Sequence, residues 1–501
     1  MDFLSNLALG LSVLMEPQNL ILCFVGVFLG TLVGVLPGLG PIATISMLIP
    51  FTFSLSPTTA VIMLAGIYYG CQYGGSTTAI LLNLPGESSS AVTAIDGNKM
   101  AAQGRGGAAL TIAALASFGA GTICTFAVAL FAVPLSHVAL KFNSADYFSL
   151  MVLGLIGSVA LSQGSVVKSL GMVVLGVLLG LVGTDIYTGA NRFTLGFYEL
   201  ADGLSFTAIA IGMFGIAEML RNLEVVDQDA QAGRVRQVGS LIPSREEARR
   251  SVWPALRGTG IGTILGILPG AGATISSFMA YALEKRISRS PEKFGTGAVE
   301  GVAAPEAANN AAAQSAFIPM LALGIPATPT LAIIMGALLA QNFAPGPTVL
   351  LKQPEFFWGI IASMWVGNLM LLVLNLPLVG LWVKLLQVPY IVLFPAVIAF
   401  CSIGTFSDSG NIFDIYTLVI ASIGGYVLSK CECEPAPLIL GLVLGPLLEE
   451  NFRRALLVSN GDPAIFLSRP ISLCLLMAAA GLLALIIVPV FRKERDAIVK
   501  E

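Results

Sequence analysis

One motif occurs twice in this chain, and it constrains the fold more than any other feature. The pattern Gly-Thr-x-x-Gly-x-Leu-Pro-Gly-x-Gly occupies residues 30–40 and returns 232 residues later at 262–272. Each copy continues into Ala-Thr-Ile-Ser, at 43–46 and at 273–276, with two residues fewer in the second copy. Eleven identities, interrupted by one two-residue deletion, indicate an internal duplication.

Both copies lie in apolar sequence that is long enough to enter a bilayer. The breaks at Pro37-Gly38 and Pro269-Gly270 remove helical hydrogen bonds where no water replaces them. Such a break is tolerated only where the backbone lines a cavity or is buried in protein. Two interrupted apolar segments at matching positions of two halves are typical of the binding site of a secondary transporter.

Composition agrees with a membrane location. The 501 residues are 56% hydrophobic and 11% charged, with a mean hydropathy of +0.86, whereas a soluble domain carries about a quarter charged residues. The apolar runs predict an all-α polytopic membrane protein with roughly ten to twelve passes, broken or re-entrant hairpins included. The net charge of −3 gives no indication of a nucleic-acid partner.

Enzyme and metal functions find little support. A single histidine and the absence of H-E-x-x-H argue against a zinc site, and no Walker A sequence is present. An intramembrane serine hydrolase needs a base beside its nucleophile, and His137 is the sole histidine. We therefore expect neither an enzyme nor a transition-metal protein.

Charge divides the chain into two repeats. Segment 221–257 carries seven arginines against five acids, and 492–495 is also basic, so both are predicted to be cytoplasmic. The predicted organisation is a first repeat (1–220, with a motif block at 20–105 and scaffold helices at 106–220), an Arg-rich linker (221–257, Arg221–Arg257) and a second repeat (258–501, with a motif block at 258–350 and scaffold helices at 356–491).

The charges beside the two motif copies predict opposite orientations. Residues 1–98 contain no Lys or Arg, whereas basic residues stand on both sides of the second copy, at 249–257 and 285–293. A hairpin with basic residues at both ends is expected to enter from the cytoplasm and return there. The uncharged copy then belongs at the outer face, which predicts an inverted-topology repeat.

Polar stretches follow each motif copy. The first half has Tyr-Gly-Cys-Gln-Tyr-Gly-Gly-Ser-Thr-Thr at 69–78 and a second break at 83–90; the second half has a polar stretch at 306–315 and a break at 324–330. Pro85 and Pro326 match at a separation of 241 residues. Glu306, Asn310 and Gln314 share one face of an alanine-rich helix, which is expected to face the protein interior or water.

These patterns predict a carboxylate site between the two Pro-Gly-x-Gly breaks. Broken helices expose N-terminal N–H groups that bind anions, and freed carbonyl oxygens ligate Na⁺. The candidate substrate-binding residues are Gly38, Gly40, Thr44, Ser46, Ser76, Thr77, Thr78, Gly270, Gly272, Thr274, Ser276, Asn309, Asn310 and Gln314. The candidate ion-coupling residues are Asn83, Pro85, Glu87, Glu306, Gly324, Pro326 and Thr328. The expected coupling ion is Na⁺ or H⁺, with no other cofactor.

Structural explanations of the same residues remain open. Gly30, Gly34, Gly262 and Gly266 are small-xxx-small pairs that permit close helix packing. The breaks are alternatively plain turns, the Ser/Thr runs helix caps, and the two glutamates surface residues. Inverted repeats with broken hairpins suggest an elevator-like motion of the motif blocks against the scaffold helices.

The chain resembles the large membrane subunit of the tripartite tricarboxylate transporters (TctA-like). The resemblance rests on segments 30–46, 69–86, 96–100, 262–276, 300–314 and 326–347. It implies a bacterial inner-membrane permease that imports citrate-like carboxylates with an ion gradient. It also implies a small four-helix membrane subunit and a periplasmic solute-binding protein as partners. The alternatives are another carboxylate substrate (tartrate, glutamate or an aromatic dicarboxylate) or a membrane protein without coupled transport.

Overall fold

The protein is built almost entirely of helices. The computed structural model describes residues 3–36, 40–160, 165–228, 238–268, 272–385 and 390–487. It is 79% helical, and its only sheet in the described residues is a two-residue antiparallel ladder, in which Gly183 pairs with Arg192. Both Pro-Gly breaks and the basic C-terminal segment lie outside the described residues.

The elements follow the two predicted halves. The first half contains α1 (Phe3–Leu14), α2 (Pro17–Gly34), α3 (Pro41–Leu48), η1 (Ile49–Thr52), α4 (Pro57–Leu82), α5 (Ser90–Ala102), α6 (Gly106–Ala139), α7 (Ser144–Ala160), α8 (Val166–Gly180), β1 (Gly183–Thr184), β2 (Asn191–Arg192), η2 (Tyr198–Leu200), α9 (Phe206–Ala210), the π-helical η3 (Ile211–Ile216) and α10 (Ala217–Gln228). The second half contains α11 (Arg245–Ile267), α12 (Gly272–Ile287), η4 (Pro291–Lys293), α13 (Glu300–Ser315), α14 (Phe317–Leu323), α15 (Pro329–Ala340), α16 (Pro347–Lys352), α17 (Pro354–Asn375), α18 (Val379–Leu385), α19 (Tyr390–Ser409), α20 (Ile412–Lys430), α21 (Ala436–Val458), α22 (Ile465–Ser468) and α23 (Pro470–Ile487).

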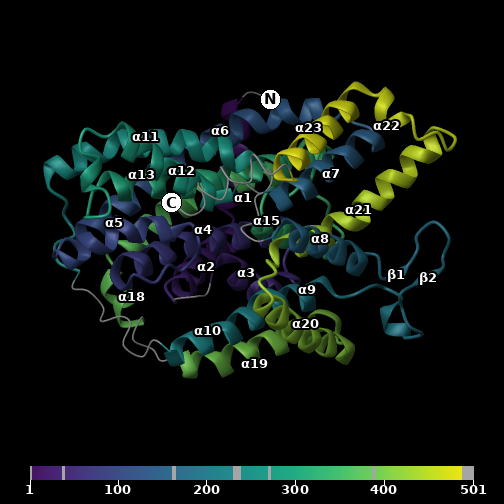
Figure 1. The fold of residues 1–501 in the computed structure, drawn as a ribbon, viewed down its shortest axis with the longest axis horizontal. Helices are drawn as coiled ribbons and strands as arrows, with labels where there is room; N and C mark the ends of the chain where they lie inside the picture. The colour runs from purple at the N-terminus through teal and green to yellow at the C-terminus, as the bar shows by residue number, and fades with distance from the viewer. Residues whose placement is uncertain are drawn as a thin grey trace.

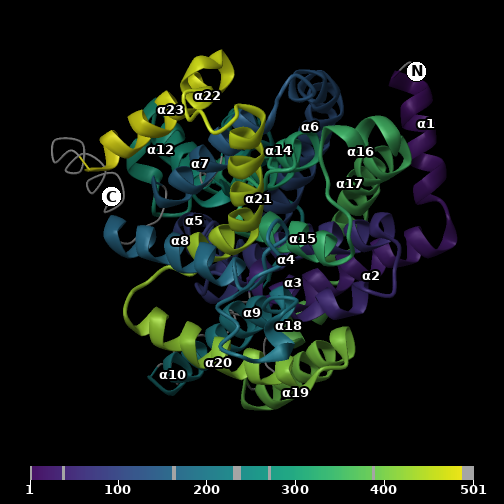
Figure 2. The same ribbon diagram turned by 90° about the vertical axis from the view of Figure 1, so that its right-hand side faces the viewer.

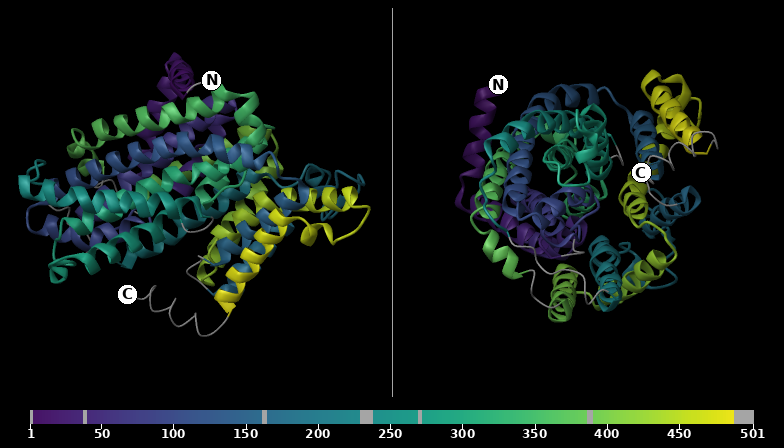
Figure 3. Two further views of the ribbon diagram at one scale, coloured as in Figure 1. Left: turned by 90° about the horizontal axis from the view of Figure 1, so that it is seen from above. Right: turned by 60° about the vertical axis from the view of Figure 1, so that its left-hand side comes forward.

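Helices suited to a bilayer occur throughout the chain. Among the described residues, α2, α6, α17 and α20 are long and apolar enough to cross a membrane, and several apolar helices of 10–17 residues accompany them. The motif helices α4 and α13 are instead buried along nearly their whole length. The long helices run side by side in one bundle, and the α21–α23 region slants away from it (Figures 1 and 3).

Close glycine packing positions the motif helices. A Cβ atom added at Gly26 or Gly30 would lie 2.3 or 2.4 Å from the carbonyl oxygen of Met63 or Ile67 of α4. The second half repeats this contact between α11 and α13, where the oxygen of Ala308 lies 2.3 Å from a Cβ added at Gly262. The small-xxx-small interpretation is therefore confirmed, and it serves to hold α2 on α4 and α11 on α13.

Each half of the chain contributes one helix that packs against the motif helix of the other half. α6 of the first half packs along α13 of the second, and α17 of the second half packs along α4 of the first. Tyr73 of α4 donates a hydrogen bond to Asn368 of α17 at 2.9 Å. α7 and α8 pack against α21 and α23, while α9, η3 and α10 pack against α20. The α10, α19 and α20 group and the α22–α23 pair lie at opposite ends of the molecule (Figure 2).

The Arg-rich segment 221–257 is not an extended loop in its described parts. It comprises the end of α10, a short non-helical stretch at 238–244 and the start of α11, which Ser244 and Glu247 cap by reciprocal hydrogen bonds. Arg250 donates to Glu300 at 2.8 Å and Arg257 to Glu284 at 2.5 Å. These ion pairs anchor α11 to α13 through Glu300 and to α12 through Glu284. The opposite orientation of the two repeats stays a prediction.

Candidate functional site

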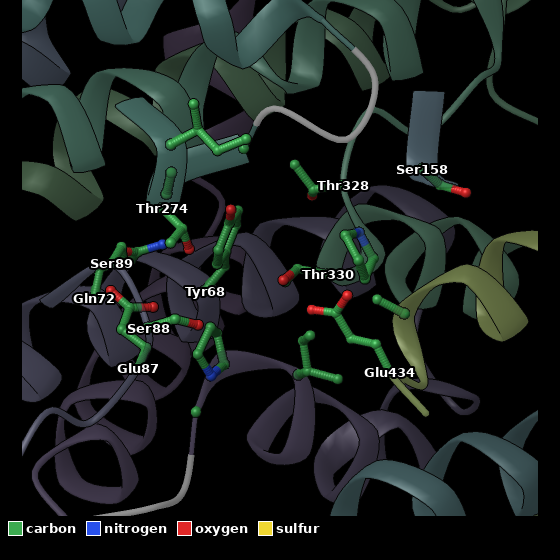
Figure 4. Close-up of a pocket in the computed structure, with 18 of the residues that line it drawn as sticks. Tyr68, Gln72, Glu87, Ser88, Ser89, Ser158, Thr274, Thr328, Thr330 and Glu434 are labelled. Carbon is green, nitrogen blue, oxygen red and sulfur yellow. The ribbon is translucent and has the colours of Figure 1, made fainter. Parts of the chain in front are cut away.

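A cavity of about 270 Å³ lies where the four helices that follow the breaks begin, beside the start of α21. Its wall contains Gly40–Ile42 at the start of α3, Gly86–Ser89 before α5, Gly272–Ile275 at the start of α12, and Thr328–Thr330 at the start of α15. Each of these helices follows one of the four breaks identified in the sequence. Both halves of the duplication therefore contribute two helix N-termini to one space (Figure 4).

Helix N-termini give this cavity an electrostatic preference. The first N–H groups of a helix have no partner within it, and the aligned peptide dipoles place roughly half a positive charge there. Pro41 and Pro329 occupy first helical positions, where a missing N–H costs nothing. Hydroxyl groups of Ser88, Thr274 and Thr330 line the same wall. The arrangement provides donors for an anion without any fixed cation.

The charged side chains around the cavity are acidic. Glu87, Glu218 and Glu434 line it, and no Lys, Arg or His does so in the described part of the chain. Glu218 comes from α10, and Glu434 precedes α21, whose first residues Ala436 and Pro437 also line the cavity. An anion bound at the helix N-termini therefore has carboxylates nearby, which favours simultaneous binding of a cation.

The second breaks of the two halves are built alike. Asn83 ends α4 with φ 59° and Gly324 ends α14 with φ 72°, both in the left-handed region. These residues stand 241 positions apart, the same separation as Pro85 and Pro326. Thr328 then accepts the backbone N–H of Leu331 at 3.2 Å and caps α15. The duplication therefore extends from the motif to the turn chemistry of the second break.

A second polar centre surrounds Glu306, which is 1% exposed. Its carboxylate accepts hydrogen bonds from Ser76 at 2.7 and 2.8 Å, from Thr93 at 2.5 Å and from Ser117 at 3.3 Å. Asn310, one turn further along α13, donates to Ser117 at 2.7 Å. The donors come from α4, α5 and α6, so this carboxylate ties three first-half helices to the second half.

The predicted polar face of α13 is confirmed. Glu306, Asn310 and Gln314 are all buried and point toward α6, where Thr125 donates to Gln314. Because this face meets α6, Asn310 and Gln314 do not line the cavity. Asn309 occupies a different face and donates to Glu87 at 3.1 Å.

The structure separates the candidate residues into groups. Those that line the cavity are Gly40, Glu87, Gly272, Thr274 and Thr328. Those whose hydroxyls bond to backbone carbonyls of nearby or neighbouring helix segments are Thr44, Ser46, Thr77, Thr78 and Ser276. Those that shape the second breaks without lining the cavity are Asn83, Pro85, Gly324 and Pro326. Gly38 and Gly270 lie outside the described residues.

Sequence reasoning missed several cavity residues. Tyr68 and Gln72 of α4 were not proposed, although Gln72 lies inside the polar stretch 69–78. Glu218 was also missed, and its signal was an isolated acid at the end of an apolar run, which in a membrane protein points to function. Glu434 had no local signal, because only the packing of α21 brings it to the cavity.

Comparison with known proteins agrees with this architecture. The model of the tripartite tricarboxylate transporter TctA family matches residues 20–440. An uncharacterized 52.8 kDa protein in the TAR-I ttuC' 3' region of Agrobacterium vitis is 56% identical over 501 residues, which cover 100% of this chain and 99% of that protein. A second A. vitis protein, from the TAR-II ttuC' 3' region, is 54% identical over 240 residues, which cover 48% of this chain and 99% of that protein. No solved structure matches the chain. The chain is therefore a multi-pass membrane protein that belongs to the tripartite tricarboxylate transporter TctA family, a family of transporters and not of enzymes.

Proposed function

We propose that this chain is the large membrane subunit of a secondary transporter that imports tricarboxylates or related carboxylates, such as citrate, with an ion gradient. The observation that carries the proposal is the convergence of four helix N-termini on one cavity. Carboxylates bind favourably at such termini because unpaired N–H groups and the helix dipoles both favour negative charge. The cavity volume of about 270 Å³ suits a small carboxylate.

The acidic lining supports ion coupling. Like charges repel strongly in a site of low dielectric constant, so a di- or tricarboxylate enters beside Glu87, Glu218 and Glu434 only with compensating cations. In this proposal Na⁺ or H⁺ supplies them. Substrate and ion then bind cooperatively, because each reduces the electrostatic cost of the other.

The proposed setting is the bacterial inner membrane. A periplasmic solute-binding protein delivers the substrate, and a small four-helix membrane subunit completes the complex; the family supports both partners. The basic segment 221–257 supports a cytoplasmic location for this linker, and we propose the same side for the C-terminus. The two Pro-Gly breaks then enter from opposite faces.

We also propose an elevator-like motion, and the packing modifies its predicted boundaries. The sequence assigned α6 and α17 to the scaffold, yet Ser117 of α6 binds Glu306 and Asn368 of α17 binds Tyr73. Breaking buried polar contacts is costly, so in this proposal both helices move with the motif blocks. The scaffold then comprises α7–α10 and α19–α23.

Uptake of labelled citrate into proteoliposomes that contain all three components tests the function. We expect accumulation that requires an inward Na⁺ or H⁺ gradient. Uptake without any gradient dependence would instead support an uncoupled pathway, and uptake of only another carboxylate would redefine the substrate.

Two labelling experiments test the topology and the motion. Single cysteines at the two breaks should react from opposite sides of the membrane in intact cells; reaction from one side only contradicts the inverted repeat. A disulfide between α15 and α21, which are in contact, should stop uptake, whereas one between α6 and α13 should spare it. Continued uptake with the α15–α21 link contradicts the moving-block proposal.

A further inference from the structure

We propose that Gln72 and Glu87, on one side of the cavity, form a Na⁺ site together with Asn309, which donates to Glu87, and that Thr328 and Thr330, further along the same wall, hold the substrate carboxylate. This inference rests on the proposed transport function and assigns the ion and the anion to two adjoining parts of one cavity.

Two buried amide oxygens provide the first evidence. The side-chain oxygens of Gln72 and Asn309 have no hydrogen-bond partner, although each residue is only 1% exposed. Buried polar atoms are nearly always paired, so an unpaired acceptor calls for a hydrogen-bond donor or a cation as its partner. Two such acceptors in one region indicate a common cause.

Both amides lie beside the same carboxylate. Asn309 donates its amide N–H to Glu87 Oε1 at 3.1 Å, which places its unpaired oxygen close to Glu87. Gln72 and Glu87 both line the cavity. The Glu87 side chain also packs on Gly75, three residues after Gln72 on α4. A Cβ atom added at Gly75 would lie 3.5 Å from Glu87 Cγ. Figure 4 shows Gln72 and Glu87 on the same side of the cavity.

The donor set selects the kind of ion. A carboxylate and two amide oxygens are hard oxygen ligands of the type that alkali and alkaline-earth ions take. The described residues contain no cluster of three His, Cys, Asp or Glu side chains that would hold a transition metal. A single protein carboxylate provides one negative charge, which matches Na⁺ better than a divalent ion. A carboxylate group of the substrate then completes the coordination.

The internal duplication relates the residues of the ion part of the cavity to those of the anion part. The separation of 241 residues relates Glu87 to Thr328 and Tyr68 to Asn309. The contact of Glu87 with Asn309 therefore has an equivalent, because Tyr68 interacts with Thr328. Tyr68 also interacts with Thr330, Gln72 and Glu87, so it lies between the two parts of the cavity. One copy of this contact pairs a carboxylate with an amide, whereas the other pairs hydroxyl groups. Equivalent positions thus present acceptors for a cation in one part of the wall and donors for an anion in the adjoining part.

Binding of ²²Na⁺ to the purified full-length chain in lipid nanodiscs, without substrate, tests the site. We expect saturable binding that K⁺ and choline do not displace. The variants Glu87→Gln, Gln72→Leu and Asn309→Leu should weaken it by at least the roughly 10- to 100-fold that loss of a supporting contact costs a metal site. Gln72→Glu, which keeps an oxygen at this position, should retain binding.

Gln341→Leu is the matched control. Gln341 also has an unpaired side-chain oxygen but does not line the cavity, so its variant should bind Na⁺ like the wild type. An equal loss of Na⁺ binding in this control contradicts the site. The site is also contradicted if the three weakened variants unfold in a thermal-unfolding assay and Gln72→Glu fails to bind Na⁺ as well. Absence of Na⁺ binding to the wild type overturns it as well.

The experiment separates this inference from the proposed function. If Na⁺ binds but no carboxylate is transported, the function is wrong and the ion site stands. If transport depends only on a pH gradient and Glu87→Gln abolishes that dependence, Glu87 carries a proton and the Na⁺ site is wrong. Thr328→Val should raise the KM for the carboxylate and leave ²²Na⁺ binding in the absence of substrate unchanged; a parallel loss of Na⁺ binding contradicts the division of the cavity into an ion part and an anion part.

Discussion

Replacing Gly262 by alanine tests how the motif positions the cavity. A Cβ atom at this position would lie 2.3 Å from the carbonyl oxygen of Ala308 and 2.9 Å from its Cα atom, well inside contact distance. The obstacle is the backbone of α13, which is buried along its whole length and cannot yield as a flexible side chain would. The two helices must therefore separate.

The expected magnitude follows from these contacts. Overpacking a well-packed interior costs about 1–3 kcal/mol, and a rigid backbone obstacle places this variant near the upper end, about 2–3 kcal/mol. Gly260 is the matched control, because it lies two residues earlier on α11 and a Cβ there meets nothing within 4 Å. Alanine in place of a mid-helix glycine gains about 0.5–1 kcal/mol. Gly260→Ala should therefore be neutral or slightly more stable than the wild type.

The free energy of unfolding, measured by SDS titration in mixed micelles, should differ by roughly 3 kcal/mol between the two variants. Uptake should also fall in Gly262→Ala alone, because α11 ends at Ile267 and the chain restarts as α12 on the cavity wall. Equal stability of the two variants would refute the close contact of α11 with α13. Normal uptake in a destabilised Gly262→Ala variant would refute the link from this contact to the site.

Further predictions concern the two polar centres. Ser76→Ala and Thr93→Val each remove a donor to the buried Glu306 carboxylate and should each lower the free energy of unfolding by about 1–3 kcal/mol; additivity in the double variant would contradict a shared centre. Thr328→Val should cost about 1 kcal/mol through loss of the α15 cap. Ser56→Ala is the control, because it removes an N-cap of the same kind from α4, away from the cavity. It should lower stability without the increase in KM expected for Thr328→Val. The same increase in KM in both variants would contradict a contact between Thr328 and the substrate.

Several features of the fold followed from the sequence because they depend on local pattern. The helices of both motif copies end just before the Pro-Gly pairs and resume just after them, since proline and glycine remove the hydrogen bonds that continue a helix. The spacing of Glu306, Asn310 and Gln314 correctly placed them on one buried face. The predicted roles of Asn310 and Gln314 in substrate binding and of Glu306 in ion coupling, by contrast, stay predictions.

Other features depended on packing over long separations in sequence. Nothing near Asn310 indicates that its neighbour would be Ser117 of α6 rather than the cavity. Likewise, no local pattern brings Glu434 to the wall that holds Glu87. Such contacts depend on which helix faces pack together.

Local patterns in the sequence were sufficient to predict a duplicated, helical membrane protein with four breaks and one polar face on α13, because periodicity, glycine and proline act within a few residues. Three other features follow from tertiary packing: the helix N-termini after the four breaks meet at one cavity, acids from α10 and the segment before α21 complete its wall, and α6 and α17 cross between the halves. These outcomes depend on the summed contacts of whole helix faces, and residues far apart in the chain contribute to them together.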